Sequence, residues 1–482
     1  MMVKARAAEV FTEMNGRAWG VLAVLCGAIF LEGIDVAMLN VALPSIRAEL
    51  GLSTGMLSGV VSAYVLGYGG FVLLGGRAAD LLGRRRMFLF WLTVFLVFSG
   101  LGGFATTGWM LLTARFVTGV AAAFLAPAGL SLITTNFAEG RVRDRALVVY
   151  AGIGAGGFTL GMVAGGLLTA LGWRWVFFVP VLVSALLLAA AYVLVRDSGV
   201  PQRVPGLAGF DLLGALSVTG AMLLLVYGVV RLEHLADGPL LTAAVFAAGF
   251  VALALFVRNE RRAAAPLVRL GVLRSVSLVR TNLVAVLFMG AFMGFQFAAT
   301  LYFQELRGWS TVQTGLAMAV LGLDAIVAPL LTPWLVRTFG TGRVIFGGVV
   351  LAALAYLLFL PSGLDRAYLA LLPTLLLIAL AFALVYGPLT IAGTDDIDEA
   401  EHGLAGGLLY TAIQFGVALG VSVVTAVNVA AVDAGKVGMD ALRTALIVPV
   451  IAAVLAGVVA ATGLRRNAKP AVVPKPEQLV HI

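Results

Sequence analysis

Long apolar runs alternate with short polar segments along the whole chain of 482 residues. A helix needs about 20 mostly apolar residues to cross the hydrocarbon core of a bilayer. The segments between the runs are too short to hold a soluble domain, so the function is expected to lie inside a helical bundle. The pattern predicts fourteen spanning helices, at residues 18–41, 55–78, 87–105, 109–135, 146–170, 173–195, 211–231, 239–257, 280–303, 312–336, 343–361, 367–392, 403–430 and 441–463.

Basic residues are spread unevenly over the polar segments. If the N-terminus is cytoplasmic, most of the 32 lysines and arginines fall in cytoplasmic segments, as the positive-inside rule requires. An even number of spans then places both termini in the cytoplasm. The same distribution accounts for the formal net charge of +8 without any nucleic-acid partner.

Composition supports an all-α, polytopic membrane protein embedded in a lipid bilayer. Hydrophobic residues make up 61% of the chain and charged residues 12%, whereas a soluble domain carries roughly 25% charged residues. Arg far outnumbers Lys, and Ala, Gly, Val and Leu dominate, which is typical of GC-rich coding. We therefore expect the protein in a bacterial cytoplasmic (plasma) membrane.

Two segments far apart in the chain resemble each other. GRAADLLGRRRM (Gly76–Met87) and PWLVRTFGTGRV (Pro333–Val344) both follow an apolar span and open the next one, with Gly83 aligned to Gly340. Such a repeat predicts a duplicated bundle. The expected division is a six-helix half over 1–195, an inserted helix pair with its flanking loops over 196–279, and a second six-helix half with a short basic tail over 280–482.

Four ionisable residues stand out within the predicted spans: Glu32, Asp35, Arg115 and Asp324. Such residues are costly in a bilayer and are functional by default. Asp35 lies nine residues before Pro44 and Arg115 six residues after Trp109. These separations place both charges at similar depth, roughly 13 and 9 Å below one surface. A pair would keep Asp35 ionised, and its separation would favour protonation, so Asp35 is the first candidate proton carrier. A static ion pair that only joins two helices is the alternative.

Two further acids are candidates for the substrate site. Glu32 lies one turn from Asp35 on the same face, where it would carry a second proton, attract a cationic substrate or simply bond between helices. Asp324 falls near the middle of its span, the depth at which such bundles bind substrate, and is a candidate for substrate recognition, a second proton or a structural role. Three polar residues complete the candidate cavity lining: Gln296, Tyr410 and Gln414.

Several motifs resemble the major facilitator superfamily, and within it the fourteen-span drug:proton antiporters. IDVAMLNVALP (Ile34–Pro44) resembles the first-span signature, GRAADLLGRRR the loop 2–3 signature, and RFVTGVAAAFLAP (Arg115–Pro127) the span-4 motif, with Thr118 in place of the usual Gln. GFTLGMVAGG (Gly157–Gly166) resembles the antiporter motif, with Met162 in place of the usual Pro.

The resemblance implies roles for these residues. It places the span-4 arginine near the span-1 acid and associates an acid at the position of Asp324 with cationic drugs. It also implies that the loop 2–3 residues lock the two halves together when the site faces outward: Gly76, Asp80, Gly83 and Arg84. The antiporter motif would contribute closely packed glycines of the fifth span: Gly157, Gly161, Gly165 and Gly166.

Together these features predict a proton-coupled exporter of small, amphipathic, cationic drug-like or antibiotic compounds, working by alternating access. We expect a monomer that uses the proton gradient and needs no cofactor, since three scattered histidines and one cysteine offer no metal site. An uptake symporter or uniporter for a metabolite is the main alternative. A polytopic enzyme or sensor is the second, although the sequence contains no catalytic constellation.

Overall fold

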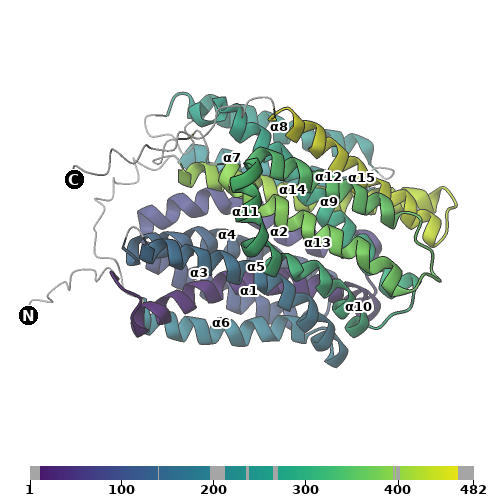
Figure 1. Ribbon diagram of the computed structural model, residues 1–482, viewed down its shortest axis with the longest axis horizontal. Helices are drawn as coiled ribbons and strands as arrows, with labels where there is room; N and C mark the ends of the chain where they lie inside the picture. The colour runs from purple at the N-terminus through teal and green to yellow at the C-terminus, as the bar shows by residue number, and fades with distance from the viewer. Residues whose placement is uncertain are drawn as a thin grey trace, which may run out of the picture.

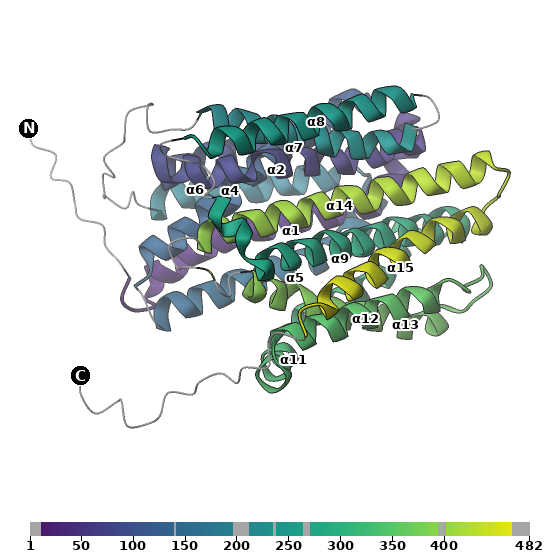
Figure 2. The same cartoon turned by 90° about the horizontal axis from the view of Figure 1, so that it is seen from above.

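The computed structural model describes residues 11–138, 141–195, 212–234, 238–263, 270–393, 397 and 402–464. These residues form a bundle of long helices, and α1 begins at the same end of the bundle at which α15 finishes (Figure 1, Figure 2). We call this the terminal end and the other the opposite end. The first half contains α1 (Gly16–Leu50), α2 (Thr54–Leu82), α3 (Arg84–Gly103), α4 (Gly108–Asn136), α5 (Arg141–Leu171) and α6 (Trp175–Leu194).

The rest of the chain begins with a pair of helices that pack on each other. The pair is α7 (Leu212–Val230) and α8 (Pro239–Glu260), joined at η2 (Arg231–His234). After the short η3 (Leu270–Arg274), the second half contains α9 (Val276–Leu301), η4 (Tyr302–Leu306), α10 (Thr311–Met318), η5 (Ala319–Leu323), α11 (Asp324–Phe339), α12 (Thr341–Phe359), α13 (Tyr368–Ala392), α14 (His402–Asp433) and α15 (Met439–Ala461).

Helix starts follow local chemistry. Ser53 and Thr107 each accept a hydrogen bond from the backbone N–H three residues on, and Ser310 forms a complete capping box with Gln313. Such side chains satisfy backbone donors that the first helical turn leaves without partners. Ten helices among the described residues are long and apolar enough to cross a membrane. Every predicted span coincides with a helix, except that residues 312–336 contain three successive helical segments.

Two expectations about local structure were wrong. The tenth predicted span is not a regular α-helix, because the tighter 3₁₀ segment η5 separates α10 from α11. The segment between the second and third spans is not a loop containing Asp80. Asp80 belongs to the last turn of α2, and Gly83 alone joins α2 to α3. Both differences arise from packing and backbone geometry that hydropathy does not report.

A one-residue link lies at the corresponding position of each of the two similar segments. Gly83 has φ 97° and ψ 119°, and Gly340, between α11 and α12, has φ 84° and ψ 152°. Each glycine ends one helix and caps the next. Glycine adopts a positive φ at these angles without strain, whereas other residues do so at an energetic cost. This explains why both links contain glycine.

The two halves meet along three groups of contacts. In the first half α2 packs on α4 and α1 on α5, while in the second α9 packs on α14 and α12 on α13. Between the halves, α2 contacts α14, α5 contacts α10 and η5, and α1 contacts α9. The pair of α7 and α8 lies beside the seam between α2 and α14, because α7 packs on both of these helices (Figure 2).

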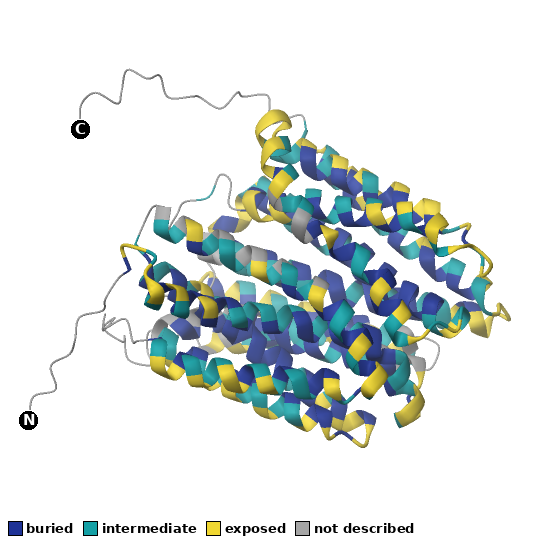
Figure 3. Ribbon diagram, turned by 60° about the horizontal axis from the view of Figure 1, so that its bottom comes forward, coloured by how far each residue is buried: buried dark blue, intermediate teal, exposed yellow. Residues whose placement is uncertain are grey.

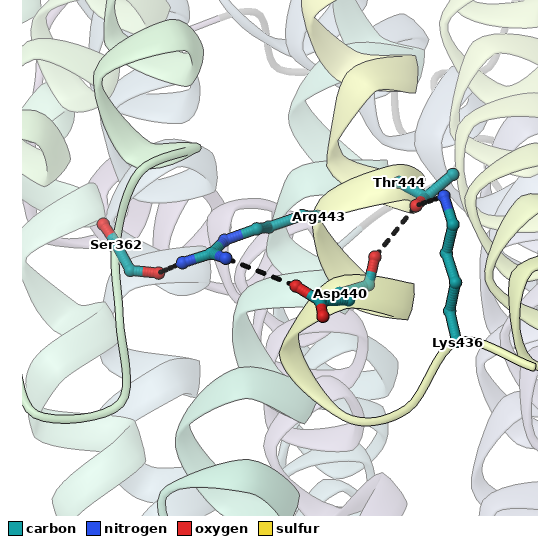
Figure 4. Close-up of polar contacts among 5 residues, drawn as sticks. All are labelled: Ser362, Lys436, Asp440, Arg443 and Thr444. Carbon is teal, nitrogen blue, oxygen red and sulfur yellow. Dashed lines mark hydrogen bonds and ion pairs between the residues drawn. The ribbon is translucent and has the colours of Figure 1, made fainter.

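Buried and exposed residues alternate along the helices (Figure 3), and large apolar side chains occur both among the buried and among the exposed residues. Phe250 is 60% exposed and Leu240 83% exposed, both on α8. Polar contacts at the opposite end tie loops of the second half together (Figure 4). Arg443 of α15 donates to the Ser362 carbonyl after α12 and pairs with Asp440, each at 3.3 Å.

Candidate functional site

Asp35 and Arg115 form an ion pair inside the first half. Asp35 belongs to α1 and Arg115 to α4, and the distance from Nη1 to Oδ2 is 2.5 Å. Both side chains are only 2% exposed. The pairing predicted from their depths is thus present, and each charge supplies the counter-ion that a buried charge requires.

Tyr64 of α2 is a third member of this buried group. Its ring centre lies 4.5 Å from the guanidinium carbon of Arg115, within the range of a cation–π interaction. The approach depends on Gly119 of α4, where an added Cβ would lie 2.9 Å from the Cα of Tyr64. Arg115 Nε and the Tyr64 hydroxyl are buried and have no hydrogen-bond partner in the described structure.

Glu32 has a different environment from Asp35. It is only partly buried, and it lies within electrostatic range of Tyr64. Four further tyrosines from both halves are also within this range, and we call them the tyrosine group: Tyr68 of α2, Tyr150 of α5, Tyr386 of α13 and Tyr410 of α14. The Glu32 carboxyl group therefore has tyrosine neighbours from both halves, whereas Asp35 is paired within one of them.

Aromatic rings extend this region across the interface. Tyr386 stacks on Phe382 at 5.1 Å between ring centres, and Phe382 lies 4.5 Å from Phe292 of α9. Phe292 in turn is 6.5 Å from Phe158 of α5, in the other half. Aromatic faces beside carboxyl groups are suited to organic cations, which are attracted to both.

Asp324 starts α11 directly after η5 and is 9% exposed. It lies within electrostatic range of Tyr386, so it approaches the tyrosine group from the second half. The backbone stays helical from η5 into α11, so Asp324 lies where the tighter 3₁₀ segment passes into a regular α-helix.

The two glutamines of the candidate lining lie in different places. Gln296 of α9 is 2% exposed, and its amide nitrogen is 3.9 Å from the sulfur of Met162 in α5. It is buried in the contact between the halves. Gln414 of α14 is partly buried, and its Cβ lies 3.7 Å from the position of a Cβ added at Gly69 of α2. A role in binding substrate stays a prediction for both.

The glycines of α5 fit the backbones of two other helices. A Cβ added at Gly157, Gly161 or Gly165 would lie 2.7–2.8 Å from backbone atoms of Phe30, Ile34 or Met38, one successive turn of α1 each. This is the close approach expected from small residues at four-residue spacing. Gly166 faces the second half instead, because its added Cβ would lie 2.8 Å from the Thr311 carbonyl oxygen.

Polar contacts join the halves at the opposite end. Arg47, in the last turn of α1, pairs with Glu305 of η4 at 2.9 Å. Gln304 donates to the Val41 carbonyl at 2.9 Å. Deeper in the bundle, the Ser62 and Ser422 hydroxyls of α2 and α14 are 3.5 Å apart. These contacts connect the halves on the side of the opposite end.

The predicted gating residues lie at the terminal end of α2 and α3. Arg84 donates to the Ser131 carbonyl of α4 at 3.4 Å, a contact within the first half. Gly76 and Asp80 lie in the last two turns of α2, and their side-chain environments fall outside the described structure. A lock between the halves by this motif therefore stays a prediction.

Sequence reasoning did not single out Tyr64, Tyr68 or Tyr150. Tyr64 and Tyr68 are four residues apart and thus lie on one face of α2. That spacing, in a span rich in glycine, was the available signal. Their proximity to Arg115 and Glu32 depends on the packing of α2 against α4 and α1 and has no local signature.

Comparison with known proteins agrees with this architecture. Residues 25–421 match the family model of the Major Facilitator Superfamily. The chain is 35% identical to the cephamycin export protein CmcT of Amycolatopsis lactamdurans, over 86% of both chains. It is also 35% identical to the puromycin resistance protein pur8 of Streptomyces alboniger, over 87% of this chain and 83% of that protein.

Solved structures show the same fold at low identity. A bacterial homolog of the human lysosomal transporter Spinster superposes with a TM-score of 0.70 at 15% identity, covering 94% of this chain and 98% of that one. The family match, the curated relatives and the apolar spans together exclude the enzyme reading. The chain belongs to the Major Facilitator Superfamily and is a multi-pass transporter of the cell membrane.

Proposed function

We propose that this transporter exports small amphipathic cations from a bacterial cell in exchange for protons. The observation that carries the proposal is that two acids one turn apart on α1 have different environments. Asp35 is paired with Arg115 inside the first half, whereas Glu32 lies within electrostatic range of the tyrosine group, whose members come from both halves. The first is suited to proton exchange and the second to a cationic substrate.

Proton exchange would work through the ion pair. Protonation of Asp35 removes the charge that holds Arg115, so the two helices gain freedom to separate. Loss of the proton restores the pair. A conformational change that opens Asp35 to one side of the membrane and then to the other would thus couple proton movement to alternating access.

For the membrane topology, the proposal adopts the arrangement predicted from the sequence. Fourteen spans with both termini in the cytoplasm would make the terminal end cytoplasmic, and the contacts that connect the halves on the side of the opposite end would then suit an inward-facing state. Two six-helix halves, within 1–195 and 280–482, would rock about the central site in a monomer, with the pair in 196–279 inserted between them and no cofactor besides the proton gradient. The relatives named for export and resistance support the outward direction.

Everted membrane vesicles test coupling and direction together. Vesicles containing wild-type protein should accumulate a fluorescent organic cation when acidified inside, and an uncoupler should abolish accumulation. Asp35→Asn should lose at least tenfold in gradient-driven uptake. Asp440→Asn, which removes an exposed acid at the opposite end, is the control and should retain uptake. Gradient-dependent movement out of the everted vesicles would instead indicate an importer, and uptake by Asp35→Asn equal to wild type would refute the assigned proton site.

A further inference from the structure

The end of α8 carries an apolar hollow with a basic rim. A cavity of about 700 Å³ is lined by Phe250, Leu253, Ala254 and Val257, and then by Arg258, Arg261 and Arg262. On a helix, residues 250, 254, 258 and 261 fall on one stripe, since they follow one another at three- or four-residue spacing. An apolar surface therefore runs directly into a cluster of three positive charges at the terminal end of the bundle.

The three arginines are available to a ligand. All three are exposed, and among the described residues none of their side chains has a hydrogen bond or ion pair. Other arginines at this end are held by the protein. Arg85 donates to the carbonyls of Val195 and Tyr192 at 2.5 and 3.0 Å, and Arg145 lies 5.3 Å from the Trp19 ring centre.

The acidic residue of this turn lies on a different face. Glu260 is 4% exposed and follows Phe256, 5% exposed, by one turn on the side that packs on α7. Among the described residues, the lining of the hollow therefore carries positive charge and no carboxylate. The positive-inside rule explains why arginines follow a span. It does not explain why Arg258 and Arg261 lie on the same face of α8 as the apolar residues that line the hollow.

We propose that this surface binds an anionic phospholipid, with its phosphate on Arg258, Arg261 and Arg262 and an acyl chain against Phe250 and Val257. The three arginines lie next to the apolar side chains, just as the charged headgroup of such a lipid lies next to its hydrocarbon chains. Basic pockets beside spanning helices are suited to anionic headgroups. The site is separate from the Asp35 and tyrosine-group region and goes beyond the transport proposal.

Native mass spectrometry of the full chain tests the site, with dioleoylphosphatidylglycerol and dioleoylphosphatidylcholine as probes. Wild type should retain the anionic lipid at least tenfold more tightly. The double substitution Arg258→Gln with Arg262→Gln should weaken binding of the anionic lipid about 30-fold. This value follows because each basic side chain near the headgroup contributes roughly 1 kcal/mol. Arg337→Gln with Arg343→Gln removes two exposed charges at the same end but away from the hollow, and is the matched control.

A second variant tests the apolar part at constant charge. Ala254→Phe fills the hollow, so it should also reduce retention of the anionic lipid severalfold. Three results would overturn the proposal: equal retention of the two lipids by wild type, equal losses in the Arg258/Arg262 and control variants, or full displacement of the lipid by an equimolar amount of inorganic phosphate, which would indicate a simple anion site.

Discussion

The ring centre of Tyr64 lies 4.5 Å from the guanidinium carbon of Arg115, while the same guanidinium reaches Asp35 through Nη1. Arg115 is thus held by a charge from α1 and a ring from α2. If Asp35 takes up a proton, the ring remains as the partner of the cation. We therefore expect Tyr64 to keep Arg115 in position during the part of the cycle in which the ion pair is neutralised.

Substitution of Tyr64 separates the ring from the hydroxyl. Tyr64→Phe keeps the cation–π contact and removes a buried hydroxyl without a described partner, so stability and transport should stay within twofold of wild type. Tyr64→Leu removes a contact worth about 2 kcal/mol when desolvated and should lower both the melting temperature and gradient-driven uptake. Equal behaviour of the two variants would show that the ring does not support Arg115.

Breaking the ion pair should cost more than removing it. Asp35→Asn leaves Arg115 as an uncompensated buried charge, which costs about 3–5 kcal/mol. Asp35→Asn combined with Arg115→Gln removes both charges and should recover most of that stability without recovering proton-driven uptake. Thermal unfolding in detergent and uptake in vesicles measure the two properties separately. A double variant as unstable as Asp35→Asn would contradict this account.

The contact of α5 with α1 offers a matched pair of substitutions. A Cβ at Gly161 would lie 2.8 Å from the Cα of Ile34, whereas a Cβ at Gly156 would meet nothing within 4 Å. Overpacking typically costs about 1–3 kcal/mol, so Gly161→Ala should be destabilised by that amount. Gly156→Ala, in the same helix, should be neutral or slightly stabilised because alanine favours the helix. Melting temperatures of the two variants decide the point.

Covalent closure of the opposite end tests whether the halves must separate there. Arg47 and Glu305 belong to different halves, so cysteines at both positions, joined by a bis-maleimide with Cys26→Ser, should stop transport. Arg174 and Glu49 pair within the first half, and the same cross-link between them should leave transport largely intact. Full activity of the cross-linked Arg47/Glu305 protein would exclude opening at this end.

Sequence was informative where a single helix determines the outcome. Apolar runs located the helices, depth along α1 and α4 predicted the Asp35–Arg115 pair, and the spacing of Gly157, Gly161 and Gly165 predicted close packing. The sequence did not predict features that depend on the packing of several helices. The 3₁₀ turn before Asp324 and the approach of Tyr64 to Arg115 depend on contacts between segments distant in the chain, and hydropathy is blind to both.

The one-residue links at Gly83 and Gly340 leave almost no slack in the chain. A one-residue link bends chiefly through its own φ and ψ. The helices that it joins, α2 with α3 and α11 with α12, therefore move relative to each other less freely than helices joined by a long flexible loop. Each half therefore carries an equivalent two-torsion pivot at the same end of the molecule, and a side chain placed at either pivot would strain that corner, because its positive φ is costly for residues other than glycine.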